Sequence, residues 1–194
     1  MRVGAVDDTG LPEATRRRML TTAMKLFSQY SFAGTSLQMI ADELDLTKAA
    51  IYYHFRTREH LLLALMQPIL DEVRTVVETA EGRRGARARA EAMVYGYAGV
   101  VARNRSLAAI TVFDPSVRSA LRGHPDWDAV IDRQLTLLTR VGPSISGAIN
   151  ASVVMTGLAG ASSSADARAL DDDELHAELV AVGRRILDLA DPER

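Results

Sequence analysis

The chain has 194 residues and a mass of 21.1 kDa, and its 47% hydrophobic and 25% charged residues predict one folded globular domain, or one domain with a small appendage. It contains no cysteine, which excludes disulfides, thiolate metal sites and cysteine nucleophiles. No segment approaches the roughly 18 unbroken apolar residues of a membrane span, and the first residues lack an apolar signal core, so we expect a cytoplasmic protein.

The net charge of −2 is unevenly distributed along the chain. Residues 14–58 hold seven cations and three anions, a net charge of +4, whereas residues 67–194 hold 15 cations and 18 anions, a net charge of −3. A basic front on a mildly acidic body is typical of proteins that bind nucleic acid with one part of the chain. A chance fluctuation in charge explains the same pattern equally well.

Apolar periodicity and the positions of the prolines predict an all-α fold, because no segment combines strict apolar–polar alternation with a hairpin turn. The expected helices cover residues 13–30, 36–44, 48–55, 57–80, 86–104, 106–113, 116–123, 126–141, 144–161 and 172–190. Pro68 lies inside the fourth helix, where it predicts a bend that serves either as a hinge or only to wrap the core.

The second and third helices are short and lie close together in the sequence. Thr35 and Gln38 have the spacing of a capping box, so we expect Thr35 to begin the second helix. Thr47 is a good N-cap for the third helix. Two short helices joined by a turn of three or four residues form a helix-turn-helix arrangement.

The third helix has an unusual polar face. Ile51 and Phe55 can pack inward with Ala50, which leaves Lys48, Ala49, Tyr52, Tyr53 and His54 mostly outward. Ammonium, phenol and imidazole groups donate hydrogen bonds to phosphate oxygens, and this face therefore indicates a DNA-contacting helix. The alternative is that the tyrosines are half-buried in an interface between domains.

Residues 16–61 resemble the N-terminal DNA-binding domain of the TetR family of bacterial transcriptional regulators. The match rests on the spacing of Ala23, Phe27, Thr35, Ser36, Ile40, Ala41, Thr47, Lys48, Ile51, Tyr52, His54, Phe55, Glu59 and Leu61. The resemblance implies a three-helix DNA-binding domain at residues 13–56 after a flexible arm at residues 1–12. It further implies a larger helical domain for effector binding and dimerisation at residues 57–194.

The chain departs from the family pattern at three positions. The family usually has glycine where this chain has Ser31 and Asp45, and often where it has Ala49. We expect the turn at Asp45 to need a left-handed backbone, which aspartate tolerates better than most residues. Ala49 puts the base specificity in doubt, but not DNA binding.

The resemblance implies a homodimer on a palindromic operator, most often acting as a repressor. We expect Lys48, Tyr52, His54 and Arg58 to contact phosphates and Thr47, Ala49 and Tyr53 to lie nearest the bases. Thr35, at the expected start of the second helix, completes the predicted DNA-binding set.

The body of the chain has more large apolar residues than one small bundle interior needs, and the resemblance implies that some of them line an effector pocket. The candidate ligand-binding residues are Met93, Tyr97, Leu107, Phe113, Trp127 and Ile131. No acid pair or arginine cluster stands out among these helices, so we expect a small, largely apolar ligand. A plain core without a ligand is the alternative.

The last two expected helices, 144–161 and 172–190, carry apolar residues on more than one face. One face can cover the core and the other a partner, and the resemblance implies that these helices form the dimer interface.

The sequence predicts neither an enzyme nor a metal or other cofactor. The four histidines are scattered and the chain has no nucleophile elbow, phosphate-binding loop or dinucleotide-binding motif. The second hypothesis is an all-helical small-molecule binder or carrier whose front domain serves packing alone.

Overall fold

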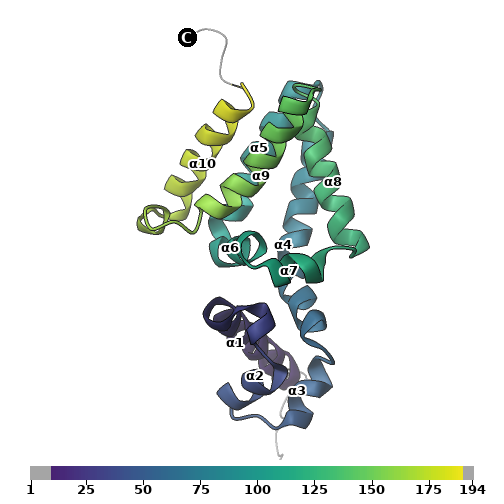
Figure 1. Ribbon diagram of the computed structural model, residues 1–194, viewed down its shortest axis with the longest axis vertical. Helices are drawn as coiled ribbons and strands as arrows, with labels where there is room; N and C mark the ends of the chain where they lie inside the picture. The colour runs from purple at the N-terminus through teal and green to yellow at the C-terminus, as the bar shows by residue number, and fades with distance from the viewer. Residues whose placement is uncertain (1–9, 190–194) are drawn as a thin grey trace, which may run out of the picture. The chain divides into compact units, whose positions relative to one another are not determined.

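The computed structural model describes residues 10–189, and all of the regular structure within that range is helical (Figure 1). The predicted all-α class is therefore confirmed. The chain divides into two compact units, of which the first ends at Leu65 and the second begins at Met66. Of the predicted arm at residues 1–12, residues 1–9 lie outside the described part of the chain. The first helix begins at Gly10.

The first unit contains three helices and the beginning of a fourth, in the order α1 (Gly10–Gly34), α2 (Leu37–Glu43), α3 (Lys48–His54) and α4 (Arg58–Glu81). Its core is built from one face of each helix. Ala23, Phe27, Ile40, Ile51 and Phe55 are all buried, and the rings of Phe27 and Phe32 meet edge to face at 5.2 Å. The apolar face predicted for the first helix therefore covers the two short helices, as its periodicity requires.

The predicted cap at Thr35 is wrong by one residue. Ser36 is the N-cap of α2, and its hydroxyl oxygen accepts a hydrogen bond from the backbone N–H of Met39 at 3.1 Å. Thr35 is buried and donates its hydroxyl to the carbonyl of Ser31 at 2.8 Å. Both residue types cap helices well, but here the Thr35 hydroxyl is hydrogen-bonded to Ser31 and the Ser36 hydroxyl caps the helix.

The turn between α2 and α3 has the expected geometry. Asp45 has a φ of 54°, the left-handed conformation predicted for this position, and the N–H of Leu46 closes the turn on the carbonyl of Ala41 at 2.9 Å. Thr47 is confirmed as the N-cap of α3, with its hydroxyl oxygen 3.2 Å from the backbone nitrogen of Ala50.

The α1 helix is kinked at Ser31, which has φ 66° and ψ 165°. This backbone region is almost exclusive to glycine, because a Cβ atom crowds the neighbouring peptide groups. The Ser31 hydroxyl partly offsets the cost by accepting the N–H of Gly34 at 3.1 Å. Ser31, like Asp45, therefore departs from the family's glycine at a position with a positive φ.

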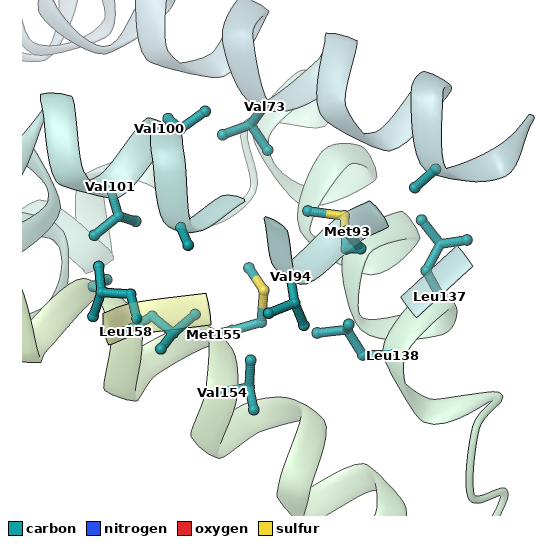
Figure 2. Close-up of a cluster of buried hydrophobic side chains, with 14 of the residues drawn as sticks. Val73, Met93, Val94, Val100, Val101, Leu137, Leu138, Val154, Met155 and Leu158 are labelled. Atoms are coloured by element: carbon teal, nitrogen blue, oxygen red, sulfur yellow. The ribbon is translucent and has the colours of Figure 1, made fainter. Parts of the chain in front are cut away.

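The second unit is a helical bundle formed by the rest of α4 and six further helices. They are α5 (Ala86–Arg103), α6 (Arg105–Phe113), α7 (Pro115–Leu121), α8 (Pro125–Thr139), α9 (Ile145–Ala161) and α10 (Asp172–Ile186), with a short 3-10 turn at Ala167–Ala169. In this unit α5 packs against α8, α9 and α10 (Figure 1). Figure 2 shows the core at their centre, where side chains from α4, α5, α8 and α9 converge.

Two glycines allow close helix packing around α5. A Cβ atom on Gly96 would lie 2.5 Å from Val76 of α4, and one on Gly183 of α10 would lie 2.7 Å from Val94 of α5. Real Cβ atoms do not approach this closely, so both contacts require glycine.

The last helix begins with a capping box. The Asp171 carboxylate accepts the N–H of Glu174 at 2.8 Å, and the Glu174 carboxylate accepts the N–H of Asp171 at 3.0 Å. These carboxylates therefore cap α10. Among residues 10–189 no cluster of three or more potential metal ligands is found, and no helix has the length and hydropathy needed to cross a bilayer.

We predict that Ser31→Gly raises the free energy of unfolding by about 0.5–1 kcal/mol, because relief of backbone strain exceeds the loss of one exposed hydrogen bond. Thermal and urea denaturation measure the change. Ser28→Gly is the matched control, since it makes the same substitution one turn earlier in the regular part of α1 and should cost about 0.5 kcal/mol. Equal destabilisation by both variants would show that Ser31 is not strained.

Candidate nucleic-acid interface and ligand cavity

The short helix α3 has one buried face and one exposed face. Ile51 and the following Phe55 are fully buried, whereas Tyr52 is 43% and Tyr53 is 83% exposed. Lys48 and Ala49 are also exposed, at the beginning of the helix. The predicted division of this helix between core and solvent is therefore confirmed.

The exposed residues of α3 and its N-cap form one surface patch, which we call the α3 face: Thr47, Lys48, Ala49, Tyr52 and Tyr53. The Lys48 ammonium lies 5.7 Å from the centre of the Tyr52 ring, one helical turn away. His54 is half-buried, with its ring 5.1 Å from that of Tyr53. The α3 face therefore presents an ammonium and two phenol groups to solvent, while His54 lies at its edge.

Arg58, which the sequence assigned to a phosphate contact, is outside the α3 face and has a structural role in the first unit. Its Nη1 donates to the carbonyls of Phe32, Ala33 and Thr35, at 3.1, 2.9 and 3.0 Å, and its guanidinium lies 5.1 Å from the centre of the Phe32 ring. These contacts neutralise the exposed carbonyl end of α1. The Nη1 of Arg58 is thus engaged with the carbonyls that follow the kink at Ser31, and the predicted phosphate contact of Arg58 stays a prediction.

Thr35 leaves the predicted DNA-binding set. Its side chain is 1% exposed and its hydroxyl is donated within the same loop. The sequence could not separate Thr35 from Ser36, because two adjacent hydroxyl residues have the same capping chemistry.

Some of the cationic side chains of residues 14–58 are bound to other groups within the first unit. Lys25 of α1 pairs with Glu43 of α2 at 2.6 Å, and the hydrogen bond to that carboxylate raises the pKa of Lys25. Arg16 lies with its guanidinium carbon 5.5 Å from the centre of the Phe55 ring. Arg17 and Arg18 are exposed beside Thr21, Thr22 and Leu44, and these two arginines are cationic surface residues that the predicted site omitted.

The second unit contains a cavity of about 300 Å³, within the size range of small-ligand sites. Its wall is mostly apolar and comes from α4 to α9. Four of the six predicted ligand-binding residues line it, namely Tyr97, Leu107, Trp127 and Ile131.

The other two predicted ligand-binding residues, Met93 and Phe113, lie elsewhere. Met93 is fully buried in the core cluster, as Figure 2 shows. Phe113 is 65% exposed, and its ring packs near Gly160 of α9. Periodicity identified both residues as apolar helix positions, but it does not distinguish a core position from a cavity wall or an outer face.

Two polar side chains in the cavity wall differ in whether they form hydrogen bonds within the protein. The Tyr97 hydroxyl donates to the carbonyl of Met155 at 3.2 Å, and burial raises the pKa of Tyr97 well above its usual value. Gln134 is fully buried, and within the described residues its Nε2 and Oε1 have no hydrogen-bond partner. The sequence analysis missed Gln134, although it stands seven residues after Trp127 on the same apolar stripe of α8.

Residues 19–65 match the family model described as bacterial regulatory proteins, tetR family. This segment is therefore similar to the DNA-binding domain of TetR-family regulators. The matched segment contains α2, the turn at Asp45, α3 and the Arg58 contacts, which together form the helix-turn-helix unit.

Curated relatives match over part of their length. The chain is 36% identical over 75 residues to the HTH-type transcriptional regulator RutR of Escherichia coli K12, covering 37% of this chain and 35% of RutR. The chain thus matches about a third of the length of that relative. The name of this relative describes a transcriptional regulator, the class that the sequence predicted for this chain.

Solved structures extend the similarity of fold to both units. A TetR-family regulatory protein from Rhodococcus RHA1 aligns with a TM-score of 0.68 at 22% identity, covering 91% of this chain and 98% of that chain. AibR, solved in complex with isovaleryl coenzyme A and operator DNA, aligns with a TM-score of 0.62 at 22% identity, covering 86% of this chain and 96% of that one. The second unit therefore has the helical fold of TetR-family C-terminal domains.

We predict that Arg58→Ala lowers the free energy of unfolding by about 1–3 kcal/mol, because three carbonyls lose their charged donor. Arg56→Ala, the removal of an exposed cation two residues earlier, should change it by less than about 0.5 kcal/mol. Urea denaturation of both variants measures the difference. Unchanged stability of Arg58→Ala together with weakened DNA binding would support the phosphate assignment.

Proposed function

We propose that this protein is a TetR-family, ligand-responsive transcriptional repressor of the cytoplasm that binds a palindromic operator as a homodimer. The observation that carries the proposal is the α3 face. It is the exposed side of a helix whose other side is buried, whose first turn is capped by Thr47, and which lies within the matched segment. The DNA-binding domain is proposed to span residues 13–56, and the effector and dimerisation domain residues 57–194.

In this proposal α3 enters the major groove. Lys48 and Tyr52 contact phosphates at its edge, with His54 beside them, while Thr47, Ala49 and Tyr53 lie nearest the bases. The Thr47 hydroxyl oxygen already caps α3, which leaves its hydroxyl hydrogen and its methyl group for the DNA. The exposed Arg17 and Arg18 add positive charge to the same unit.

The outer face of α9 supports the proposed homodimer. Ile145, Ile149 and Val153 follow one another at four-residue spacing, and they are 84%, 56% and 47% exposed. The opposite face of α9, with Val154 and Leu158, is buried in the core. A helix that is apolar all round needs cover on both sides, and a second copy of α9 across a two-fold axis provides matching apolar cover.

The cavity supports the proposed effector site. Its volume and apolar wall suit a small ligand, and the similar fold of AibR has been solved with isovaleryl coenzyme A, a short acyl group on a larger carrier. A ligand releases the operator only if it binds one arrangement of the protein better than another. Couplings of about 1–3 kcal/mol, equal to about 5- to 150-fold in operator affinity, are usual.

The second candidate function is a small-molecule binder without a DNA-binding role, which the cavity alone would support equally well. The two functions differ in their salt dependence. DNA binding releases counterions from the phosphates, so its affinity falls steeply with salt, whereas binding of an apolar ligand does not. A mobility-shift screen against the promoter beside the protein's own gene tests the proposal most directly.

We predict that Lys48→Ala weakens operator binding and reduces the slope of log affinity against log salt by about 1, because one phosphate contact is lost. Tyr52→Phe should weaken binding to all sequences to a similar extent, whereas changes at Tyr53 should alter the preferred sequence. Fluorescence anisotropy with labelled duplexes at several salt concentrations measures both effects.

The control for this experiment is Lys25→Ala, which removes a lysine paired with Glu43 and away from the α3 face. It should leave the salt slope unchanged. A Lys48→Ala slope equal to the wild-type slope would remove Lys48 from the phosphate contacts, whereas no binding to any duplex would favour the carrier function.

We predict that Ile149→Glu converts the homodimer to a monomer, because a carboxylate would be buried in the apolar contact without a partner. Analytical ultracentrifugation measures the mass, and circular dichroism checks that the helices remain. Ser119→Glu is the control, since it adds the same charge to an exposed position on α7 and should leave the dimer intact. A dimeric Ile149→Glu protein would place the interface elsewhere.

A further inference from the structure

Gln134 is a buried polar residue in an otherwise apolar part of α8. Its side chain is fully buried, and neither its Nε2 nor its Oε1 forms a hydrogen bond with any described residue. The neighbouring helical positions that share its face, such as Trp127, Val130 and Ile131, also line the cavity. Gln134 itself is part of the cavity wall. An unsatisfied buried carboxamide is costly to folding, so its presence there requires a compensating role.

The other buried or half-buried polar side chains of the wall have partners within the protein. The Tyr97 hydroxyl donates to Met155, the Thr111 hydroxyl donates to the carbonyl of Ala108 at 2.7 Å, and the Asn104 amide donates to the carbonyl of Val100 at 2.9 Å. Their hydrogen bonds stabilise the helices. Among the buried and half-buried polar side chains of the described wall residues, Gln134 is therefore the one whose donor and acceptor are both still available.

The chemistry of a carboxamide defines what would complement it. It presents an N–H donor and a carbonyl acceptor side by side, and the matching group presents a carbonyl beside an N–H. A primary amide or a lactam meets this requirement with two parallel hydrogen bonds. A carboxylate does not, because it could accept from Nε2 but would bring a negative charge against Oε1.

The charge of the wall also favours a neutral group. Arg118 is the one charged side chain among the described wall residues, and it is exposed rather than buried beside Gln134. A carboxylate buried beside Gln134 loses its hydration, and an exposed, solvated arginine compensates that loss less than a buried one. The surroundings of Gln134 therefore disfavour an anionic headgroup.

We propose that the cavity recognises a neutral amide or lactam attached to an apolar body, with the Gln134 carboxamide as its hydrogen-bonding partner. This proposal rests on the proposed function for the regulatory role of the ligand, but not for its binding. The apolar wall binds the body of the ligand with little selectivity, and Gln134 supplies the selection by functional group.

The proposal is tested with a matched set of probes: octanamide, octanoate at pH 7 and methyl octanoate. Their apolar bodies are alike, but only octanamide offers a donor and an acceptor together. The cavity volume equals that of about ten water molecules, which suits probes of this size. Trp127 is the sole tryptophan and lines the cavity, so its fluorescence reports binding without DNA.

We predict that octanamide binds the wild-type protein about five- to tenfold more tightly than methyl octanoate, and more tightly than octanoate. Gln134→Leu should remove the preference for octanamide over the ester while raising the melting temperature of the ligand-free protein, because a similar volume is kept and the unsatisfied amide is lost. Thr111→Val is the matched control, since it removes a polar wall group whose hydroxyl is already donated within its helix. This variant should keep the preference.

A spectroscopic readout locates the contact. In a nitrogen-15 spectrum, the side-chain amide signals missing from Gln134→Leu identify Gln134, and octanamide should shift them more than methyl octanoate does. Equal affinities for all three probes, a preference that survives in Gln134→Leu, tighter binding of octanoate, or no binding of octanamide at its solubility limit would each overturn the proposal. Operator binding measured separately, without probe, distinguishes this failure from failure of the proposed function.

Discussion

The burial of Ile51 and Phe55 holds α3 against the rest of the first unit, and the exposed side of the helix depends on it. A helix of seven residues is too short to be stable in water by itself, so its orientation comes from packing and capping. With these two residues inside and Thr47 fixing the first turn, the 3.6-residue period directs Lys48, Tyr52 and Tyr53 outward. The same contacts thus stabilise the unit and shape the surface that we propose meets DNA.

The first unit tolerates two backbone conformations that usually call for glycine. Asp45 adopts a left-handed turn that aspartate accepts at modest cost, whereas Ser31 occupies a region that nearly excludes residues with a Cβ atom. The Arg58 guanidinium compensates, since it binds three carbonyls at the end of α1 and lies over Phe32. Arg58, which the sequence marked only as a possible phosphate ligand, thus also helps to hold the kink in place.

In the second unit, α9 contributes to two different surfaces. Its inner face completes the core and part of the cavity wall through Met155 and Ala159, while its outer face exposes Ile145, Ile149 and Val153. If a second copy covers the outer face, as we propose, a ligand in the cavity would lie one helix away from the dimer contact. A shift of α9 on binding would then change both surfaces together, which is one physical route from a ligand to the geometry of a dimer.

The sequence by itself determined the helical class, the approximate limits of each helix, the turn at Asp45 and the division of α3 into inner and outer faces. These features follow from local rules, namely periodicity, capping and the conformational preferences of single residues. It did not determine which of two adjacent hydroxyl residues caps α2, or that Arg58 binds backbone carbonyls 23 to 26 residues earlier. It also did not separate Met93 in the core from Tyr97 at the cavity, because both stand on the apolar face of α5. Those distinctions, and the unpaired carboxamide of Gln134, depend on which helices meet around each side chain, and only the tertiary structure decides that.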